Sequence, residues 1–260
     1  MSTEKPKIEL LNMDCMEYMA GLPDNVFDLA IVDPPYGMLQ YKWDKAPQMD
    51  ILIRSLKRVV KDNGTMIFFS QQPFTSTVVT ALGKSFSHEI IWHKTQKGGF
   101  PNANRMPLRA HENIIVAKVK TGVFYNPIKV KRGGGGRVRT QTSDRNSGYG
   151  KINLGGNYVD TGLKFPESVI KISNWNGAIF GDTKNSVKHP TQKPVELYSW
   201  ILKHYARPHC NIVDPFLGSA SSAISANQMG FDFVGCELDK DYYDAACKRF
   251  KEQTKQLSLL

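Results

Sequence analysis

The stretch that decides the fold is Phe27-Asp28-Leu29-Ala30-Ile31-Val32, followed at once by Asp33-Pro34-Pro35-Tyr36. The apolar run predicts a buried strand of a parallel sheet, because such strands are covered on both faces. In parallel sheets the chemistry lies just beyond the carboxyl ends of the strands. The strand therefore delivers a carboxylate, two prolines and an aromatic ring to the rim of a predicted active site.

The Asp33–Tyr36 segment has hydrogen-bonding properties that suit a planar amine. Each proline has a fixed φ and no N–H group, and Pro34 also biases Asp33 toward an extended backbone. The Asp33 carboxylate and the Pro34 carbonyl can then accept hydrogen bonds beside the flat ring of Tyr36. We predict that this segment binds a planar ring with an exocyclic NH2 group. For these four residues alone, a strand-ending turn with a packed tyrosine is an equal alternative.

A second strand, turn and helix is indicated by Ile212-Val213-Asp214-Pro215-Phe216-Leu217-Gly218-Ser219 and the following residues up to Met229. Small residues in this turn let a ligand approach the backbone. The next apolar stretch, Phe231–Asp239, predicts a strand that ends about 20 residues after the turn, at Glu237. An acid at that distance is placed to accept hydrogen bonds from ribose hydroxyls.

Together these motifs resemble those of the amino-directed, S-adenosylmethionine-dependent DNA methyltransferases. Their catalytic motif is Asp/Asn/Ser-Pro-Pro-Tyr/Phe, and their cofactor loop is usually Asp-Pro-Phe-x-Gly-Ser-Gly. This chain departs mildly from the loop, since Ala220 stands where the second glycine is usual. The catalytic motif precedes the cofactor motif, which resembles the beta group of the family. The resemblance covers residues 7–118 and 175–250.

The resemblance implies an α/β, Rossmann-like methyltransferase fold, with a mostly parallel sheet, helices on both faces and a basic inserted target-recognition region. We predict a catalytic half over residues 1–118, the insert over 119–174 and a cofactor-binding half over 175–260. The patterns predict strands at 8–11, 29–32, 65–69 and 88–93, helices at 49–61, 73–82, 194–204 and from 242, a turn at 62–64, and a mobile loop over 131–162.

The resemblance also assigns residues to roles. The implied catalytic residues are Asp33, Pro34, Pro35 and Tyr36. The residues implied to hold S-adenosylmethionine are Asp14, Cys15, Asp33, Lys193, Pro194, Asp214, Pro215, Phe216, Gly218, Ser219, Glu237 and Leu238. Lys193 and Pro194 belong to a segment, 189–197, that resembles the one holding the methionine end of the cofactor. For Asp14 the alternative is a helix N-cap, and one aspartate could serve both purposes.

The implied reaction is methyl transfer to the N6 amine of a flipped-out adenine in DNA. Asp33 favours adenine, because relatives that act on cytosine N4 more often have serine at that position. The alternatives are an N4-cytosine methyltransferase and a DNA-binding protein of this fold without turnover. No metal is expected, since His111 and Glu112 lack the further ligands that a metal site needs.

Positive charge is concentrated in one part of the chain. The formal net charge is +10, yet residues 92–151 contain thirteen Lys or Arg against two acidic residues, so the remainder is near neutral. A basic run is often only a solvated surface. Its position in the expected recognition insert favours phosphate contacts with double-stranded DNA. The predicted DNA-binding residues are Lys129, Lys131, Arg132, Arg137, Arg139 and Arg145.

The remaining composition points to a cytoplasmic protein. No apolar stretch approaches the ~18 residues of a membrane span, and residues 1–7 lack an apolar signal core. The four cysteines form no Cys-x-x-Cys pair, so reduced thiols are expected. The resemblance allows a homodimer and a separate restriction nuclease as partners.

Overall fold

The computed structural model describes residues 5–38, 44–131, 162–174 and 192–255, together with the backbone of short strands at 138–141, 145–147, 150–152 and 156–159. The chain forms two compact units. The first comprises residues 1–126 and 168–260, and the second comprises residues 127–167. The division into functional parts at 118 and 174 stays a prediction.

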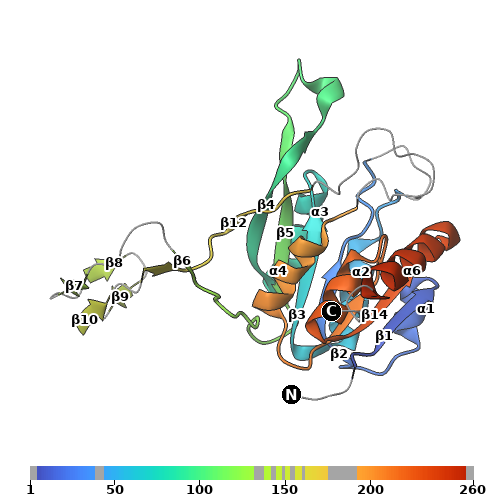
Figure 1. Cartoon of the computed structure of the whole chain (residues 1–260), viewed down its shortest axis with the longest axis horizontal. Coiled ribbons are helices and arrows are strands. Elements are labelled where there is room, and N and C mark those ends of the chain that lie inside the picture. The colour runs from blue at the N-terminus through green and yellow to red at the C-terminus, as the bar shows by residue number, and fades with distance from the viewer. Residues whose placement is uncertain are drawn as a thin grey trace. The chain divides into compact units, whose positions relative to one another are not determined.

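The first unit is built on one eight-stranded sheet, with strand order β1-β14-β13-β2-β3-β5-β4-β12 (Figure 1). Neighbouring strands are parallel except that β5 is antiparallel to both β3 and β4, so the predicted mostly parallel sheet is confirmed. In the order of the sheet, the strands are Ile8–Asn12, Asp232–Glu237, Asn211–Asp214, Phe27–Val32, Val60–Ser70, Arg109–Lys118, Phe86–Gly98 and Val169–Lys171.

Six helices cover the two faces of this sheet, as predicted. Helices α1 (Cys15–Ala20), α2 (Met49–Val59) and α3 (Phe74–Leu82) pack on one face. Helices α4 (Val195–Tyr205), α5 (Ser221–Met229) and α6 (Lys240–Lys255) pack on the other. No helix in the described part of the chain combines the length and the apolar character of a membrane-spanning segment.

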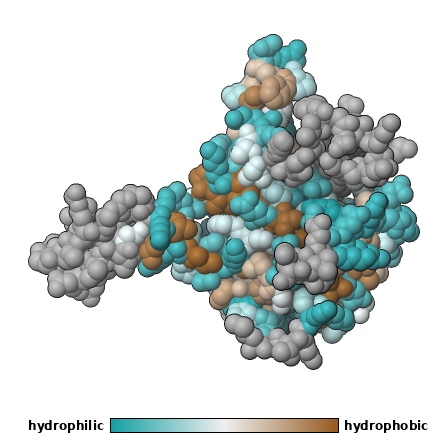
Figure 2. All heavy atoms as spheres, in the orientation of Figure 1, coloured by the Kyte–Doolittle hydropathy of each residue, from teal (hydrophilic) through white to brown (hydrophobic). Residues whose placement is uncertain are grey.

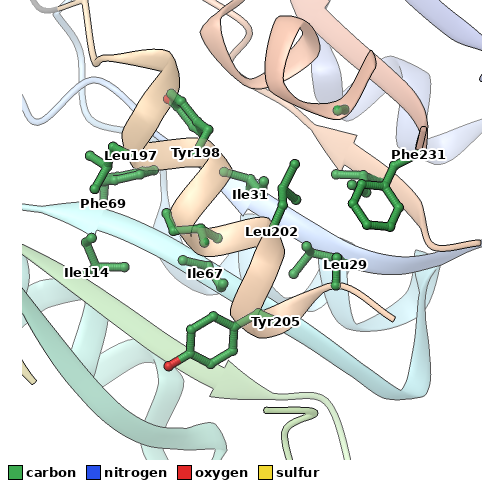
Figure 3. Packing of buried hydrophobic residues seen from close by; sticks show 14 of the residues in the cluster. Leu29, Ile31, Ile67, Phe69, Ile114, Leu197, Tyr198, Leu202, Tyr205 and Phe231 are labelled. Carbon is green, nitrogen blue, oxygen red and sulfur yellow. The ribbon is translucent and has the colours of Figure 1, made fainter. Parts of the chain in front are cut away.

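Two hydrophobic cores lie on opposite faces of the sheet, because side chains alternate along a strand. In β2, Leu29 and Ile31 pack beneath α4, whereas Ala30 and Val32 belong to the other core. Figure 3 shows Leu29 and Ile31 beside Leu202 of α4. Burying one such aliphatic side chain stabilises the fold by about 1.5–3 kcal/mol. The continuous apolar run of β2 is thus explained by burial on both faces.

The turn predicted at 62–64 is wrong. Helix α2 ends at Val59, and β3 begins at the next residue and continues through Gly64. The pairing of β2 with β3 shifts from Phe27↔Val60 to Leu29↔Thr65, so the intervening residues form an irregularity within the strand. A Cβ atom on Gly64 would lie 2.8 Å from the Asp28 carbonyl oxygen. The glycine therefore permits a close backbone approach rather than a chain reversal.

The strand predicted at 88–93 is longer than expected, extending over Phe86–Gly98 as β4. It forms a hairpin with β5 through a short 3₁₀ turn, η2 (Phe100–Asn102), and this hairpin projects beyond the helices (Figure 1). Phe100 and Met106, near its end, are 69% and 48% exposed. Figure 2 shows apolar and hydrophilic atoms mixed on this projection. A second 3₁₀ turn, η1 (Gly83–Ser85), precedes β4.

The second unit contains three antiparallel strand pairs, so the loop predicted over 131–162 is wrong in these segments. β6 (Val130–Lys131) pairs with β11 (Leu163–Lys164). β7 (Val138–Gln141) pairs with β10 (Gly156–Val159), and β8 (Arg145–Ser147) pairs with β9 (Gly150–Ile152). These short strands are rich in polar residues and glycine. They lack the apolar alternation by which a strand is recognised from sequence.

Both attachments of the second unit are fixed by hydrogen bonds within the first. The Asn126 amide donates to the His204 carbonyl at 2.7 Å, just before the second unit begins. The Ile91 amide donates to the Ser168 carbonyl at 2.7 Å, just after it ends. The chain therefore leaves and re-enters the first unit at anchored points.

Candidate active site

A cleft of about 1060 Å³ lies at the carboxyl ends of β2, β13 and β14. These three strands are direct neighbours in the sheet, which explains why motifs about 180 residues apart in sequence meet in space. The predicted residues that line the cleft are Asp14, Cys15, Asp33, Pro34, Pro35, Tyr36, Lys193, Pro215, Phe216, Gly218, Ser219, Glu237 and Leu238. Two of the residues predicted for catalysis or cofactor binding are not among those that line it. Pro194 is the N-cap of α4, and Asp214 is buried at the end of β13.

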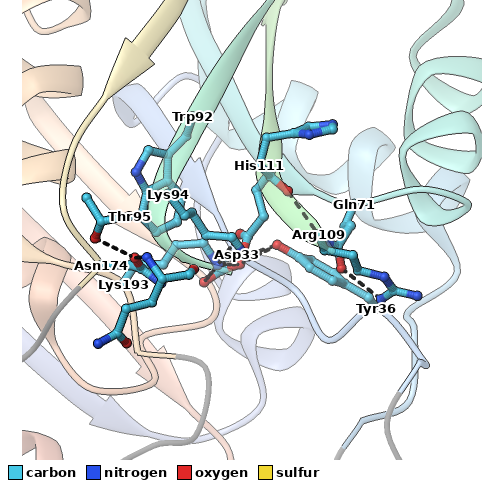
Figure 4. A network of polar contacts seen from close by, with 12 residues as sticks. Asp33, Tyr36, Gln71, Trp92, Lys94, Thr95, Arg109, His111, Asn174 and Lys193 are labelled. Carbon is cyan, nitrogen blue, oxygen red and sulfur yellow. Dashed lines mark hydrogen bonds and ion pairs between the residues drawn. The ribbon is translucent and has the colours of Figure 1, made fainter. Parts of the chain in front are cut away.

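Asp33 forms an ion pair with Lys193 (Figure 4). The Lys193 Nζ atom lies 2.6 Å from both Asp33 Oδ1 and Asp33 Oδ2. The Lys193 side chain is only 5% exposed and that of Asp33 is 19% exposed. The rings of Phe69 and Tyr36 flank the ammonium group, with centroids at 4.8 Å and 5.6 Å. The predicted contact of Lys193 with the cofactor stays a prediction, and the contact seen in the structure is with the carboxylate of Asp33.

Tyr36 is held in place from two sides. Its hydroxyl group donates a hydrogen bond to Asp33 Oδ1 at 3.1 Å. Its ring stacks on Phe74 of α3, with centroids 5.3 Å apart and planes 23° apart. Burial, with the Asp33 charge, raises the pKa of Tyr36 well above its usual value, so the hydroxyl keeps its proton. A ring clamped in this way is a preformed flat surface at the edge of the cleft.

Two charged residues extend this network, and the sequence analysis did not assign either of them to the site. Lys94 Nζ donates to Glu112 Oε1 at 2.9 Å, and Lys193 Nζ lies 3.6 Å from Glu112 Oε2. Lys94 is near the end of β4 and Glu112 is near the beginning of β5. Because β5 runs antiparallel to β3, its first residues, not its last, reach the edge where the cleft lies. Glu112 therefore does not follow an apolar run in the sequence, as Asp33, Asp214 and Glu237 do.

Burial and charge pairing oppose each other in this cluster. Burial raises the pKa of Asp33 by more than the Lys193 ammonium lowers it. Burial lowers the pKa of Lys193, but the Asp33 and Glu112 carboxylates raise it by more, so the lysine remains charged. Burial also raises the pKa of Glu112, but the charges of Lys193 and Lys94 lower it by more, so the pKa of Glu112 is below its usual value. In this cluster two lysines, Lys94 and Lys193, thus face two carboxyl groups, those of Asp33 and Glu112.

The predicted cofactor turn is organised by two carboxylates. Asp214 accepts hydrogen bonds from the Phe216 amide at 2.9 Å and from the Ser222 hydroxyl at 2.6 Å. Burial raises the pKa of Asp214 to about 7. Glu237 Oε2 accepts from the Gly218 amide at 2.9 Å, and Glu237 Oε1 accepts from the Asp239 amide at 3.0 Å. These bonds fix Glu237 at the rim while leaving each oxygen with further lone pairs for ligand hydroxyls.

Ala220, the residue that departs from the usual loop motif, has a left-handed backbone with φ 62° and ψ 23°. That conformation favours glycine, which explains why glycine is usual at this position. Gly218 also has a positive φ, of 51°. The loop therefore keeps its conformation at Ala220 against the preference of the side chain.

Asp14 is the N-cap of α1. Its Oδ1 atom accepts hydrogen bonds from the Met16 amide at 2.7 Å and from the Glu17 amide at 3.2 Å. Asp14 also lines the cleft, so its role as an N-cap is compatible with the predicted cofactor contact, which stays a prediction. Burial raises the pKa of the adjacent Cys15 to about 12, so this thiol stays neutral and is a poor nucleophile.

The predicted DNA-binding residues all fall in the second unit. Lys129 and Lys131 are exposed, and Lys129 Nζ lies 4.5 Å from the centroid of the Phe165 ring. Arg132 and Arg137 lie outside the described residues. Arg139 is in β7 and Arg145 is in β8, where the structure describes the backbone and not the side chains.

Comparison with known proteins gives consistent results across sequence and structure. The chain is 25% identical over 259 residues to the type II methyltransferase M.BglII of Bacillus subtilis, covering 92% of this chain and 67% of that protein. It is 24% identical over 262 residues to M1.MboII of Moraxella bovis, covering 90% and 93% of the two chains. Both relatives are named as type II methyltransferases.

Solved structures show the same fold. The M1.HpyAVI–SAM complex has a TM-score of 0.58 at 20% identity, covering 94% of this chain and 99% of that one. The PvuII DNA methyltransferase, which is cytosine-N4-specific, has a TM-score of 0.65 at 13% identity, covering 97% and 94%. A family profile described as DNA methylase matches residues 27–248, from the strand before Asp33 to the C-terminal helix. The chain therefore belongs to the N6/N4 family of DNA methylases.

Proposed function

We propose that this DNA methyltransferase transfers a methyl group from S-adenosylmethionine to the N6 amine of an adenine that is flipped out of the duplex. The observation that carries the proposal is the Asp33 carboxylate, which lies in the cleft beside the clamped ring of Tyr36. An aspartate at this position of the motif favours adenine over cytosine. A base inside a duplex cannot reach such a cleft, so the proposal includes base flipping.

The cofactor end of the cleft suits S-adenosylmethionine. When bound, this molecule supplies a sulfonium methyl group that a nitrogen nucleophile can attack. Glu237 offers oriented acceptors for ribose hydroxyls, and Leu238, 69% exposed, offers an apolar surface for a purine ring. The turn at Gly218 and Ser219 lets the ligand approach the backbone.

The catalytic end of the cleft suits an aromatic amine. The lone pair of such an amine is delocalised into its ring, so the nitrogen is a weak nucleophile. Hydrogen bonds from the NH2 group to the Asp33 carboxylate and the Pro34 carbonyl favour a pyramidal nitrogen with a localised lone pair. Tyr36 provides a stacking surface, for which about 1–3 kcal/mol per base is typical. Positioning and preorganised charge then supply most of the rate, without an enzyme nucleophile.

The β4–β5 hairpin is a second basic surface, separate in sequence from the predicted insert. Between Lys94 and Arg109 the hairpin carries four basic residues and no acidic one. Lys94 and Arg109 line the cleft, whereas Lys97 and Arg105 are exposed beyond it. This charge next to the catalytic end is suited to phosphates that flank a flipped base. The DNA-binding role of the insert is proposed on the same electrostatic ground.

The test is tritiated methyl transfer from S-adenosylmethionine to unmethylated genomic DNA, followed by mass spectrometry of the nucleosides. N6-methyladenine is the expected product. N4-methylcytosine would keep the enzyme class and overturn the base assignment. Cofactor binding without any methylated nucleoside would support a DNA-binding protein without turnover. A homodimer and a partner nuclease stay predictions, which light scattering and co-purification from the native host would test.

A further inference from the structure

Lys193 lies between two carboxylates but is hydrogen-bonded to only one of them. Its Nζ atom is 2.6 Å from both oxygens of Asp33 and 3.6 Å from Glu112 Oε2. The longer separation is an ion pair beyond hydrogen-bonding distance. Glu112 is oriented by its other oxygen, Oε1, which accepts from Lys94.

Glu112 Oε2 is the unusual atom of this cluster. Within the described part of the chain, it is a buried side-chain oxygen without a hydrogen-bond donor. Buried polar atoms are nearly always hydrogen-bonded, so each exception calls for an explanation. Glu112 lines the cleft, so the unsatisfied oxygen belongs to the catalytic end of the site.

The resting position of Lys193 conflicts with the proposed reaction. The amine of the target base must donate to Asp33, but the ammonium already bridges both oxygens of that carboxylate. A cation at this place withdraws negative charge from the acceptor. It also opposes the positive charge that the attacking nitrogen acquires as it forms its new bond.

We propose that Lys193 is a positioning residue with two positions, hydrogen-bonded to Asp33 when no target base is bound and to Glu112 Oε2 when the target amine enters. This inference rests on the proposed function, because it requires an amine substrate. A displacement of about 1 Å converts the 3.6 Å ion pair into a hydrogen bond. The move frees Asp33 for the base and satisfies the oxygen that otherwise has no donor.

The surroundings of Lys193 suit such a short movement. Its carbonyl group accepts a hydrogen bond from the Ser221 hydroxyl at 2.7 Å, which holds the backbone while the flexible side chain can shift. The Phe69 ring stays beside the ammonium, giving it a favourable aromatic neighbour. The total charge of the cleft does not change, since the cation passes from one carboxylate to another.

The test compares Glu112→Gln with wild type on two DNA duplexes. One carries, in unmethylated form, the base that the nucleoside assay identifies as the target, and the other carries an analogue of that base without its exocyclic amine. The variant is expected to lower kcat by at least about tenfold, because the charged acceptor for Lys193 is lost. It should weaken binding of the amine-containing duplex while binding the analogue as tightly as wild type does. Cofactor affinity should stay within about twofold.

A purely structural role for Glu112 would weaken both duplexes equally, and that result would overturn the proposal, as would an unchanged kcat. Glu89→Gln, an exposed acid on β4, is the matched control. Wild-type turnover in the same assay separates failure of this inference from failure of the proposed function. If Glu112→Gln does not fold, a crystal structure of the wild-type enzyme with DNA and S-adenosylhomocysteine would show which carboxylate Lys193 contacts. We expect that structure to show Lys193 hydrogen-bonded to Glu112. If Lys193 still bridged the two oxygens of Asp33, the proposed movement would be refuted.

Discussion

The Lys193 ammonium lies 2.6 Å from each carboxylate oxygen of Asp33, although the two residues are 160 positions apart in the chain. Asp33 follows β2, and Lys193 immediately precedes Pro194, the N-cap of α4. This contact joins the Asp33–Tyr36 segment to the segment that leads into α4. The segments that follow β2 and precede α4 are therefore electrostatically coupled.

Asp33→Ala should abolish measurable methyl transfer while leaving the affinity for S-adenosylmethionine within a few-fold of wild type. Loss of one preorganised electrostatic group typically costs about 10²- to 10³-fold in kcat, and here the acceptor for the reacting amine is lost as well. Steady-state methylation and calorimetric cofactor titration measure the two effects. Asp24→Ala, at an exposed ion pair with Arg58, is the control. Surviving turnover would show that the assigned chemistry is wrong.

Glu237→Gln should weaken cofactor binding about tenfold, with a smaller effect on kcat. The two Glu237 oxygens each accept a backbone N–H, from Gly218 and Asp239. A glutamine presents an NH2 group to one of these donors, and a lost hydrogen bond to a charged group costs about 1.5–3 kcal/mol. Calorimetric titration with S-adenosylmethionine measures the change. Equal affinity in the variant would remove Glu237 from the cofactor site.

Stability should decrease with rising pH through the titration of Asp214. Its folded pKa is about 7, above the value near 4 of an unfolded aspartate, so the folded protein retains a proton that the unfolded chain has lost. This contribution is complete below about pH 4 and is lost as pH rises through about 7. Relative to Asp214→Asn, the wild-type free energy of unfolding should fall by about 2 kcal/mol from about pH 5.5 to 7. Urea titrations of both proteins test this, and parallel pH profiles would contradict it.

Substitutions at Ala220 should report on the left-handed backbone. Ala220→Gly relieves strain but removes a buried methyl group, so these effects of about 1 kcal/mol each nearly cancel. Ala220→Val adds a β-branched side chain in a conformation that such residues avoid, which costs about 1–3 kcal/mol. Thermal unfolding should show Tm nearly unchanged for Gly and lowered by several degrees for Val. A valine variant as stable as wild type would show that the loop adopts another backbone in solution.

Neutralising the hairpin should flatten the salt dependence of DNA binding. Each phosphate contact contributes about 0.9 to the slope of log K against log salt. Lys97→Gln with Arg105→Gln should therefore reduce the slope by up to about 2, measured by fluorescence anisotropy on a duplex. Lys84→Gln, at an exposed lysine in η1, just before β4, is the control and should leave the slope unchanged. The same assay on Arg137→Glu with Arg139→Glu tests the insert, and an unchanged slope would remove it from the interface.

The parallel part of the sheet could be predicted from sequence because each buried strand ends in a recognisable polar residue. Asp33, Asp214 and Glu237 follow apolar runs, and they meet because β2, β13 and β14 are neighbours. Glu112 could not be found in this way, because it lies at the beginning of an antiparallel strand. Its role depends on long-range strand order, which local patterns do not contain.

The errors over 62–64 and 131–162 have a related cause. Asp62-Asn63-Gly64 has the composition of a turn, but the residues on either side, Val60 and Thr65, pair with β2, so it lies as an irregularity within β3. The pairs β7–β10 and β8–β9 are short ladders without an apolar face in their sequence. Tertiary pairing decides the structure in both places, and residue propensities do not reveal it.

The anchored attachments at Asn126 and Ser168 have an evolutionary consequence. All the described residues that line the cleft belong to the framework outside 127–167, so we expect that the intervening segment can be lengthened, shortened or exchanged without disturbing them. On the proposed DNA-binding role of this segment, selection can act on the choice of target and on the chemistry separately. Enzymes descended from the same framework are then expected to diverge fastest in this segment, and transplanting it between relatives would test whether it redirects the enzyme to a new target.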